Sequence, residues 1–266
     1  MNGLLERMAT TTFGAAGLYP TRLTEAADVR ALIASLAPID AGRALIRLGP
    51  GGDGGYLVPD DLDGIEACFS PGVSSISGFE KECAERGMRV FLADKSVDGP
   101  AEAHPRFAFV KKHVGASTGG DVVSMDDWVA QSLPGSNAEL LLQMDIEGAE
   151  YETLLAMPEP LLRRFRIAVF ELHGLNHLWS KLFFRFASAT FAKLLGTHTC
   201  VHIHPNNCCG VVKRGALEIP RNAEFTFLRN DRVTSRKFAT RFPHPLDRDN
   251  TAKAPLPLPA CWIGGA

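Results

Sequence analysis

The feature that most constrains the fold is a repeated pattern of short apolar runs, each followed by a turn and then by a helical pattern. This alternation is typical of βαβ units, in which helices join parallel strands. The apolar runs lie at residues 65–70, 88–94, 107–114, 139–145 and 166–172. The sequence therefore predicts a Rossmann-like α/β fold with a doubly wound, mostly parallel central sheet.

Segments on either side of these runs complete the predicted architecture. Apolar residues recur at helical intervals over residues 23–48, which predicts an N-terminal covering helix, and a short strand is expected at 56–58. Residues 178–196 predict an apolar helix. Residues 199–205 and 223–229 alternate as strands do, so we expect an antiparallel pair that closes one edge of the sheet.

Three regions follow from this reading of the chain. Residues 1–45 form an N-terminal helical cover, residues 46–242 form one α/β domain, and residues 243–266 form a proline-rich tail. Trp262 is a candidate anchor for the tail. The aromatic residues of the apolar helix predict core packing or a contact between copies in a homo-oligomer.

Composition limits the classes of partner and compartment. The formal net charge of -2 gives no positive field for binding nucleic acid, so a small-molecule or glycan partner is expected. No stretch reaches the roughly 20 apolar residues that span a bilayer, and the N-terminus lacks the apolar core of a signal peptide, which predicts a cytoplasmic protein. The six cysteines form no CxxC pair and are expected to be reduced thiols, including the neighbours Cys208 and Cys209.

A candidate cofactor site begins where the first strand of the repeat ends. Gly72 lies at the strand-to-helix turn, Ser74 follows it, and such a turn presents backbone N–H groups to a ligand. Asp94 ends the next strand, where nucleotide-binding folds place a carboxylate that accepts hydrogen bonds from ribose. The turn lacks GxGxxG, which favours S-adenosylmethionine over NAD, and Asp53 in the GGDGG loop is expected near the methionine ammonium group.

Polar residues end the two central strands that follow. Asp145 ends the run 139–145, and Glu171 and His173 share one face at the end of 166–172, so all three are expected to face one crevice. A carboxylate or an imidazole can take the proton of a hydroxyl that is being alkylated, and His173 is our first choice of general base. Glu147 is a further candidate contact of this site.

A divalent cation is a second interpretation of the same groups. Asp145 and Glu171, together with His173 or His204, would hold a cation that binds two sugar oxygens. No spacing in the sequence requires this, so both interpretations stay open.

Three segments together resemble the FkbM family of S-adenosylmethionine-dependent methyltransferases. They are LLLQMDIEGAEYETLL at 140–155, IAVFELHG at 167–174 and VHIHPNN at 201–207. The resemblance implies a class I methyltransferase fold, S-adenosylmethionine as the methyl donor, and hydroxyl groups of sugars, glycans or related natural products as acceptors. The chain departs from the family at the first motif, where FSPGVSSISG replaces the usual D-x-G-A-x-x-G.

The resemblance also assigns roles to individual residues. The cofactor residues it implies, with those argued above, are Asp53, Gly72, Ser74, Asp94, Asp126 and Asp145. It implies that Asp126 lies near the adenine, and that His204 and Asn207 contact the acceptor. An O-methyltransferase is thus the expected function, with an NAD-dependent oxidoreductase or a noncatalytic nucleotide-binding module as the alternatives.

Overall fold

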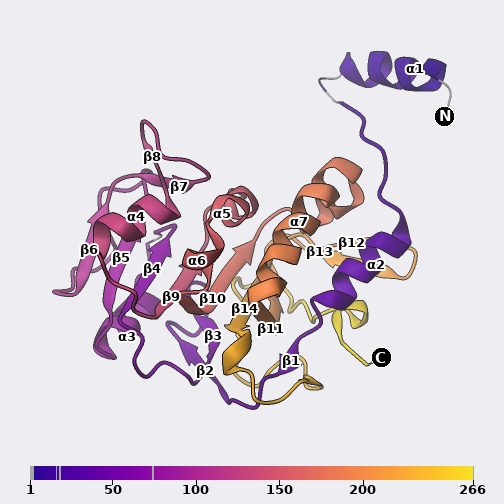
Figure 1. Ribbon diagram of the computed structural model, residues 1–266. Helices are drawn as coiled ribbons and strands as arrows, with labels where there is room; N and C mark the ends of the chain where they lie inside the picture. Colours follow the sequence, from indigo (N-terminus) through magenta and orange to yellow (C-terminus); the bar gives the residue numbers. More distant parts are fainter. Residues whose placement is uncertain (1–2, 16, 18, 74, 266) are drawn as a thin grey trace.

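The computed structural model describes residues 3–15, 17, 19–73 and 75–265. In this part of the chain a seven-stranded sheet has the order β11-β14-β10-β9-β4-β5-β6 (Figure 1). Its strands are β4 (Ala67–Pro71), β5 (Arg89–Ala93), β6 (Phe107–Val110), β9 (Leu140–Met144), β10 (Phe165–Leu172), β11 (His198–Pro205) and β14 (Ala223–Arg229). The predicted Rossmann-like α/β fold with a mostly parallel sheet is confirmed.

Strand β14 runs in the opposite direction to the other six strands of the central sheet. It pairs antiparallel with both β10 and β11, whereas the other pairings of the sheet are parallel. The six strands that share one direction have the chain order 3-2-1-4-5-6, which is the doubly wound order, and β14 lies between the fifth and the sixth. The order reverses between β4 and β9, and ligands bind beyond the carboxyl ends of strands at such a switch point.

Two apolar clusters cover the two faces of the sheet. Helices α2 (Ala26–Ser35), α4 (Met125–Ser132), α5 (Glu150–Ala156) and α7 (Lys181–Thr197) contribute to the larger cluster. Helix α3 (Gly78–Glu85) and the hairpin of β2 (Leu45–Leu48) and β3 (Tyr56–Pro59) pack on the opposite face. Among the described residues, no helix is both long and apolar enough to cross a membrane.

The N-terminal region differs from the predicted continuous helix over 23–48. Helix α2 ends at Ser35, and β1 (Ile39–Asp40) pairs instead with β15 (Lys237–Phe238) near the C-terminus. Pro38 explains the break, because the residue before a proline is disfavoured in the helical conformation. Helix α1 (Gly3–Gly14) lies apart from the sheet, with exposed side chains at Met8 and Phe13 (Figure 1).

Smaller elements fill the connections. The predicted strand 107–114 is split into β6 and β7 (His113–Gly115), and β7 pairs with β8 (Val122–Ser124). The link between β11 and β14 contains a hairpin, β12 (Val211–Arg214) and β13 (Leu217–Pro220), that the sequence analysis missed. The remaining elements are α6 (Glu159–Leu162), η1 (Leu175–Trp179), η2 (Asn230–Arg232) and η3 (Ala260–Trp262).

The cysteines and the tail show one wrong prediction and one observed anchor. Cys208 and Cys209 form a disulfide, so the prediction of reduced thiols is wrong for this pair. Neighbouring side chains on an extended segment point apart, but these two cysteines lie in a turn. Trp262 in the tail is 1% exposed, and its indole N–H donates to the carbonyl oxygen of Glu218 at 3.0 Å.

Candidate functional site

The candidate site lies at the switch point between β4 and β9. Gly72 follows β4 with φ +90°, and an added Cβ there would lie 1.5 Å from the backbone oxygen of Asp145. The amide of Gly72 donates to Ala93 at the end of β5, and the amide of Asp145 donates to Pro71. Glycine is therefore required at this turn, because it brings the ends of β4, β5 and β9 into contact.

A small cleft opens at this contact. Its volume is about 40 Å³. The lining residues are Asp53, Gly54, Tyr56, Gly72, Ile76, Glu80, Gln143 and Asp145. The structure thus brings together Asp53, Gly72 and Asp145, three of the residues predicted to bind the cofactor.

The sequence did not predict the polar side chains of Tyr56, Glu80 and Gln143, which line the cleft, or the buried Ser70 hydroxyl that contacts two of them. The Ser70 hydroxyl lies 2.6 Å from an oxygen of Glu80 and 2.6 Å from the amide oxygen of Gln143. The amide nitrogen of Gln143 donates to the Tyr56 hydroxyl at 3.2 Å. Gln143 interrupts an otherwise apolar strand, LLLQM, and a polar residue within a buried strand was the signal that could have identified this network.

The remaining predicted cofactor residues are placed differently. Asp94 accepts a hydrogen bond from the amide of Val73 at 3.0 Å, and its other oxygen accepts from Ser96. Its carboxylate therefore already fixes the turn after β4. Ser74 lies outside the described residues. Asp126 is exposed in the first turn of α4 and does not line the cleft.

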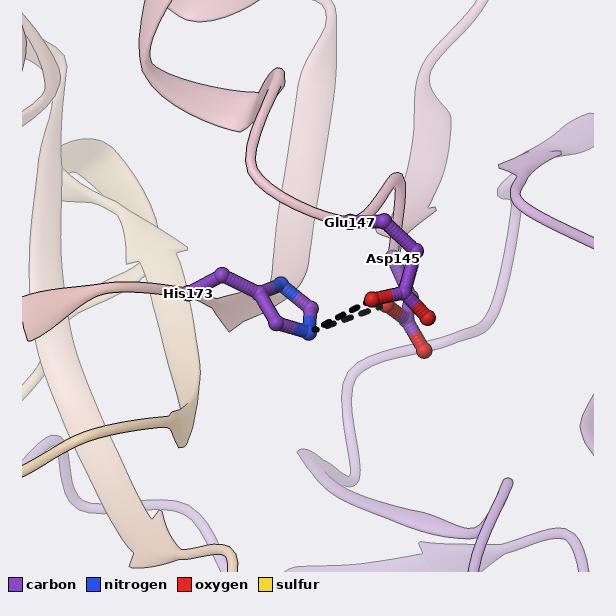
Figure 2. Close-up of side chains that lie close together, drawn as sticks. All are labelled: Asp145, Glu147 and His173. Carbon is purple, nitrogen blue, oxygen red and sulfur yellow. Dashed lines mark ion pairs between the residues drawn. The ribbon is translucent and has the colours of Figure 1, made fainter. Parts of the chain in front are cut away.

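His173 lies among acidic groups from two neighbouring strand ends (Figure 2). Its Nε2 atom is 3.5 Å from Glu147 and 3.9 Å from both Asp145 and Glu171. Its Nδ1 atom is 3.1 Å from Glu150, which lies in the first turn of α5. Asp145 and Glu171 therefore lie close to His173, and of the three only Asp145 lines the cleft described above.

Burial and charge shift the pKa values of this cluster strongly. Burial and the negative charge of Glu171 raise the pKa of Asp145 to about 8. Burial alone would lower the pKa of His173, but the hydrogen bond to Glu150 and the surrounding carboxylates outweigh burial and raise it to about 9. His173 is therefore protonated at neutral pH, and it becomes a general base only after it has lost that proton.

A row of polar residues continues across the sheet from this cluster. Glu171 on β10 pairs in register with Glu224 on β14, which pairs with His204 on β11. The Asn206 amide donates to Glu171 at 2.7 Å, and the Asn250 amide donates to Glu224 at 2.7 Å. Both glutamates are buried, and burial raises the pKa of each.

His204 and Asn207 bind the C-terminal tail rather than an open acceptor pocket. His204 Nε2 lies 2.9 Å from the carbonyl oxygen of Arg248. The Asn207 amide donates to the carbonyl oxygens of Thr251 and Lys253, each at 3.0 Å. His204 is therefore not brought into the cation cluster that the sequence suggested, because the tail occupies its ring nitrogen.

Similarity to known proteins is confined to solved structures. No protein-family model and no curated protein matches the chain. Among solved structures it is similar to the N-methyltransferase NodS from Bradyrhizobium japonicum WM9, with 13% identity and a TM-score of 0.34, over 62% of this chain and 86% of that one. This likeness carries no conclusion about reaction or substrate, and membership of the FkbM family stays a prediction.

Glu224 leads to a prediction about the pH dependence of stability. Its pKa in the folded protein is raised to about 8 by burial, while Asn250, His204 and Arg47 oppose the shift and Glu171 adds to it. The folded state therefore favours the protonated form, so this stabilising contribution is complete below pH 4.5 and is lost as pH rises towards 8. Glu224→Gln should remove this loss and raise the free energy of unfolding at pH 8 by at least about 1 kcal/mol.

Urea unfolding at pH 5 and pH 8 measures this effect. The advantage of Glu224→Gln over the wild type should grow between the two pH values, whereas the control Glu85→Gln, at an exposed position on α3, should show no such growth. Equal differences at both pH values would contradict the assignment of Glu224 as the titrating group.

Proposed function

We propose that this protein is an S-adenosylmethionine-dependent O-methyltransferase that acts on a hydroxyl group of a sugar, glycan or related natural product. The observation that carries the proposal is the contact between Gly72 and Asp145 at the switch point of a sheet with one reversed strand, where Asp94 binds the amide of Val73 next to Gly72. This strand arrangement is the one expected for the class I methyltransferase fold. The absence of GxGxxG from the turn after β4 disfavours a dinucleotide at the same place.

The residues around the cleft fit the two ends of an adenosyl amino acid. Asp94 at the end of β5 would accept the ribose hydroxyls, and Asp53 would face the ammonium group. Gly72 lets the backbone of Asp145 approach the end of β4 closely, and both residues line the cleft. The cleft is small, at about 40 Å³, and Ile76 lines it, so we expect the side chain of Ile76 to move when the ligand binds.

The acceptor half would supply alignment and a route for the proton. When bound, S-adenosylmethionine supplies a methyl group that is activated by the positive sulfur. The acceptor hydroxyl would lie beside Asp145, Glu171 and His173, and its proton would pass to whichever of these groups has first lost its own. Asn206 would fix the orientation of Glu171 through the 2.7 Å hydrogen bond between them.

Isothermal titration with S-adenosylmethionine, S-adenosylhomocysteine and NAD tests the donor half. We expect the two adenosyl ligands to bind and NAD not to bind. Asp94→Ala should weaken the adenosyl ligands by at least about tenfold, because a hydrogen bond to a charged group contributes about 1.5–3 kcal/mol. The matched control is Asp98→Ala, which removes a carboxylate that is 97% exposed and pairs with Lys111.

Each other outcome contradicts the proposal. Tight binding of NAD alone would indicate an oxidoreductase, and binding of none of the three nucleotides would leave only the fold. Equal weakening by Asp94→Ala and Asp98→Ala would place the ribose elsewhere. Because Asp94 also fixes the turn at Val73, a urea unfolding curve of each variant is needed to show that the fold is retained.

A further inference from the structure

Three side chains at neighbouring strand ends offer one ligand atom each to a common point. Asp145 follows β9, Glu147 lies in the loop before α5, and His173 follows β10 (Figure 2). One ligand atom from each residue lies within 4.8 Å of the others. Ligands of one cation at about 2.0–2.4 Å have separations in this range.

Glu150 holds His173 in the orientation that a metal ligand needs. The Glu150 side chain is fully buried, and one of its oxygens accepts from the amides of Ile146 and Gly148 and lies 3.1 Å from His173 Nδ1. This directs Nε2 towards Asp145 and Glu147. A carboxylate behind a histidine is the usual arrangement around protein metal ions, since it fixes the ring and the tautomer.

An unsatisfied oxygen and an excess of carboxylates around His173 point to a missing ligand. Asp145 Oδ1 is buried and has no hydrogen-bond partner within the described part of the chain, although a buried acceptor without a partner is destabilising. Glu171, whose side chain is 5% exposed, adds a further carboxylate 3.9 Å from His173 Nε2. Within the described residues, no lysine or arginine forms an ion pair with Asp145, Glu147 or Glu171.

We infer that Asp145, Glu147 and His173 bind one divalent cation, of which Mn²⁺ and Mg²⁺ suit the ligands best. Two carboxylates and one imidazole match the ligands that these oxygen-preferring ions accept, and Mn²⁺ tolerates the nitrogen more readily. The cation binds the neutral imidazole, so it takes the place of the proton on Nε2 of His173, which is released to solvent. The proposed set differs from the one suggested by the sequence, because it contains Glu147 in place of Glu171 and His204. Three protein ligands leave coordination positions open to other oxygens.

A role for the cation follows only if the proposed methyltransferase function holds. Two adjacent hydroxyl groups of a sugar could occupy the open positions, which would lower the pKa of the hydroxyl that is methylated. The ion would thereby select acceptors with neighbouring oxygens. Binding of the ion itself does not depend on the methyl donor and can be measured without it.

Titration of the chelator-treated full chain with Mn²⁺, followed by electron paramagnetic resonance of the free ion, tests the site. We expect saturable binding of one Mn²⁺ per chain, with competition by Mg²⁺. Glu147→Gln and Asp145→Asn should each weaken binding by at least about tenfold. The control Glu152→Gln removes an exposed carboxylate from α5, the helix that follows Glu147, and should leave binding unchanged.

The outcomes separate this inference from the function proposed above. Absence of saturable binding, or equal weakening by Glu147→Gln and Glu152→Gln, would overturn the cation site even if S-adenosylmethionine binds. Mn²⁺ binding that is lost in Glu147→Gln would support the site even if S-adenosylmethionine does not bind. Glu147 is 87% exposed, so its substitution tests the site without risk to the fold.

Discussion

Gly72→Ala is expected to lower the free energy of unfolding by at least about 4 kcal/mol, a change at the extreme of what single substitutions produce. The added Cβ would lie 1.5 Å from the backbone oxygen of Asp145, and neither backbone segment can move away without separating β4 from β9. The positive φ of +90° adds about 1–2 kcal/mol of strain for an L-residue. Because natural domains are stable by about 5–15 kcal/mol, this variant should be largely unfolded or poorly soluble.

The control variant Gly87→Ala separates the effect of the steric clash with Asp145 from the effect of backbone strain. Gly87 also has a positive φ, of +94°, but nothing lies within 4 Å of its added Cβ. This control should therefore lose only about 1–2 kcal/mol in urea unfolding followed by tryptophan fluorescence. Similar losses of unfolding free energy in the two variants would show that the ends of β4 and β9 are not in close contact. The candidate site, which is built on that contact, would then be contradicted.

The fold was predictable from the sequence because burial on both faces of a parallel strand produces a continuous apolar run. All five runs from the repeated pattern became strands of the central sheet, and the late alternating segments became β11 and β14. The extent of the covering helix was not predictable from periodicity, because residues 39–48 pair with segments that are distant or form a hairpin. The β12–β13 hairpin was missed because it is short and only partly buried.

The candidate site was predictable at the strand ends and much less so in the loops. The ends of β9 and β10 place Asp145, Glu171 and His173 together, since parallel strands end at the same edge of the sheet. The positions of Glu147 and Glu150 depend on a loop in which Glu147 has a positive φ of 55°, and helical spacing does not predict this. The bonds of the tail to His204 and Asn207 span 44 residues, and no local pattern indicates them.

Asp247→Ala is expected to destabilise the protein by about 3–5 kcal/mol at neutral pH, the usual effect of removing one partner of a buried ion pair. Asp247 is 6% exposed, lies 2.8 Å from His202 Nε2 and 3.6 Å from His204 Nδ1, and accepts from the amide of His244. Burial alone would raise the pKa of Asp247, but the two histidines outweigh burial and hold it well below its usual range. Its stabilising contribution is therefore present above about pH 4 and is lost as pH falls further.

Asp249→Ala is the matched control, because Asp249 is an exposed aspartate two residues further along the tail. It should unfold in urea as the wild type does at both pH 7 and pH 3, whereas the deficit of Asp247→Ala should shrink at the lower pH. A deficit that stays constant with pH would mean that packing, rather than charge, holds the tail. If charge does hold it, the tail fixes His204 beside Glu224, and it fixes Asn207 next to Asn206, which binds Glu171. The proposed acceptor side of the candidate site then depends on a segment that follows the last strand of the central sheet.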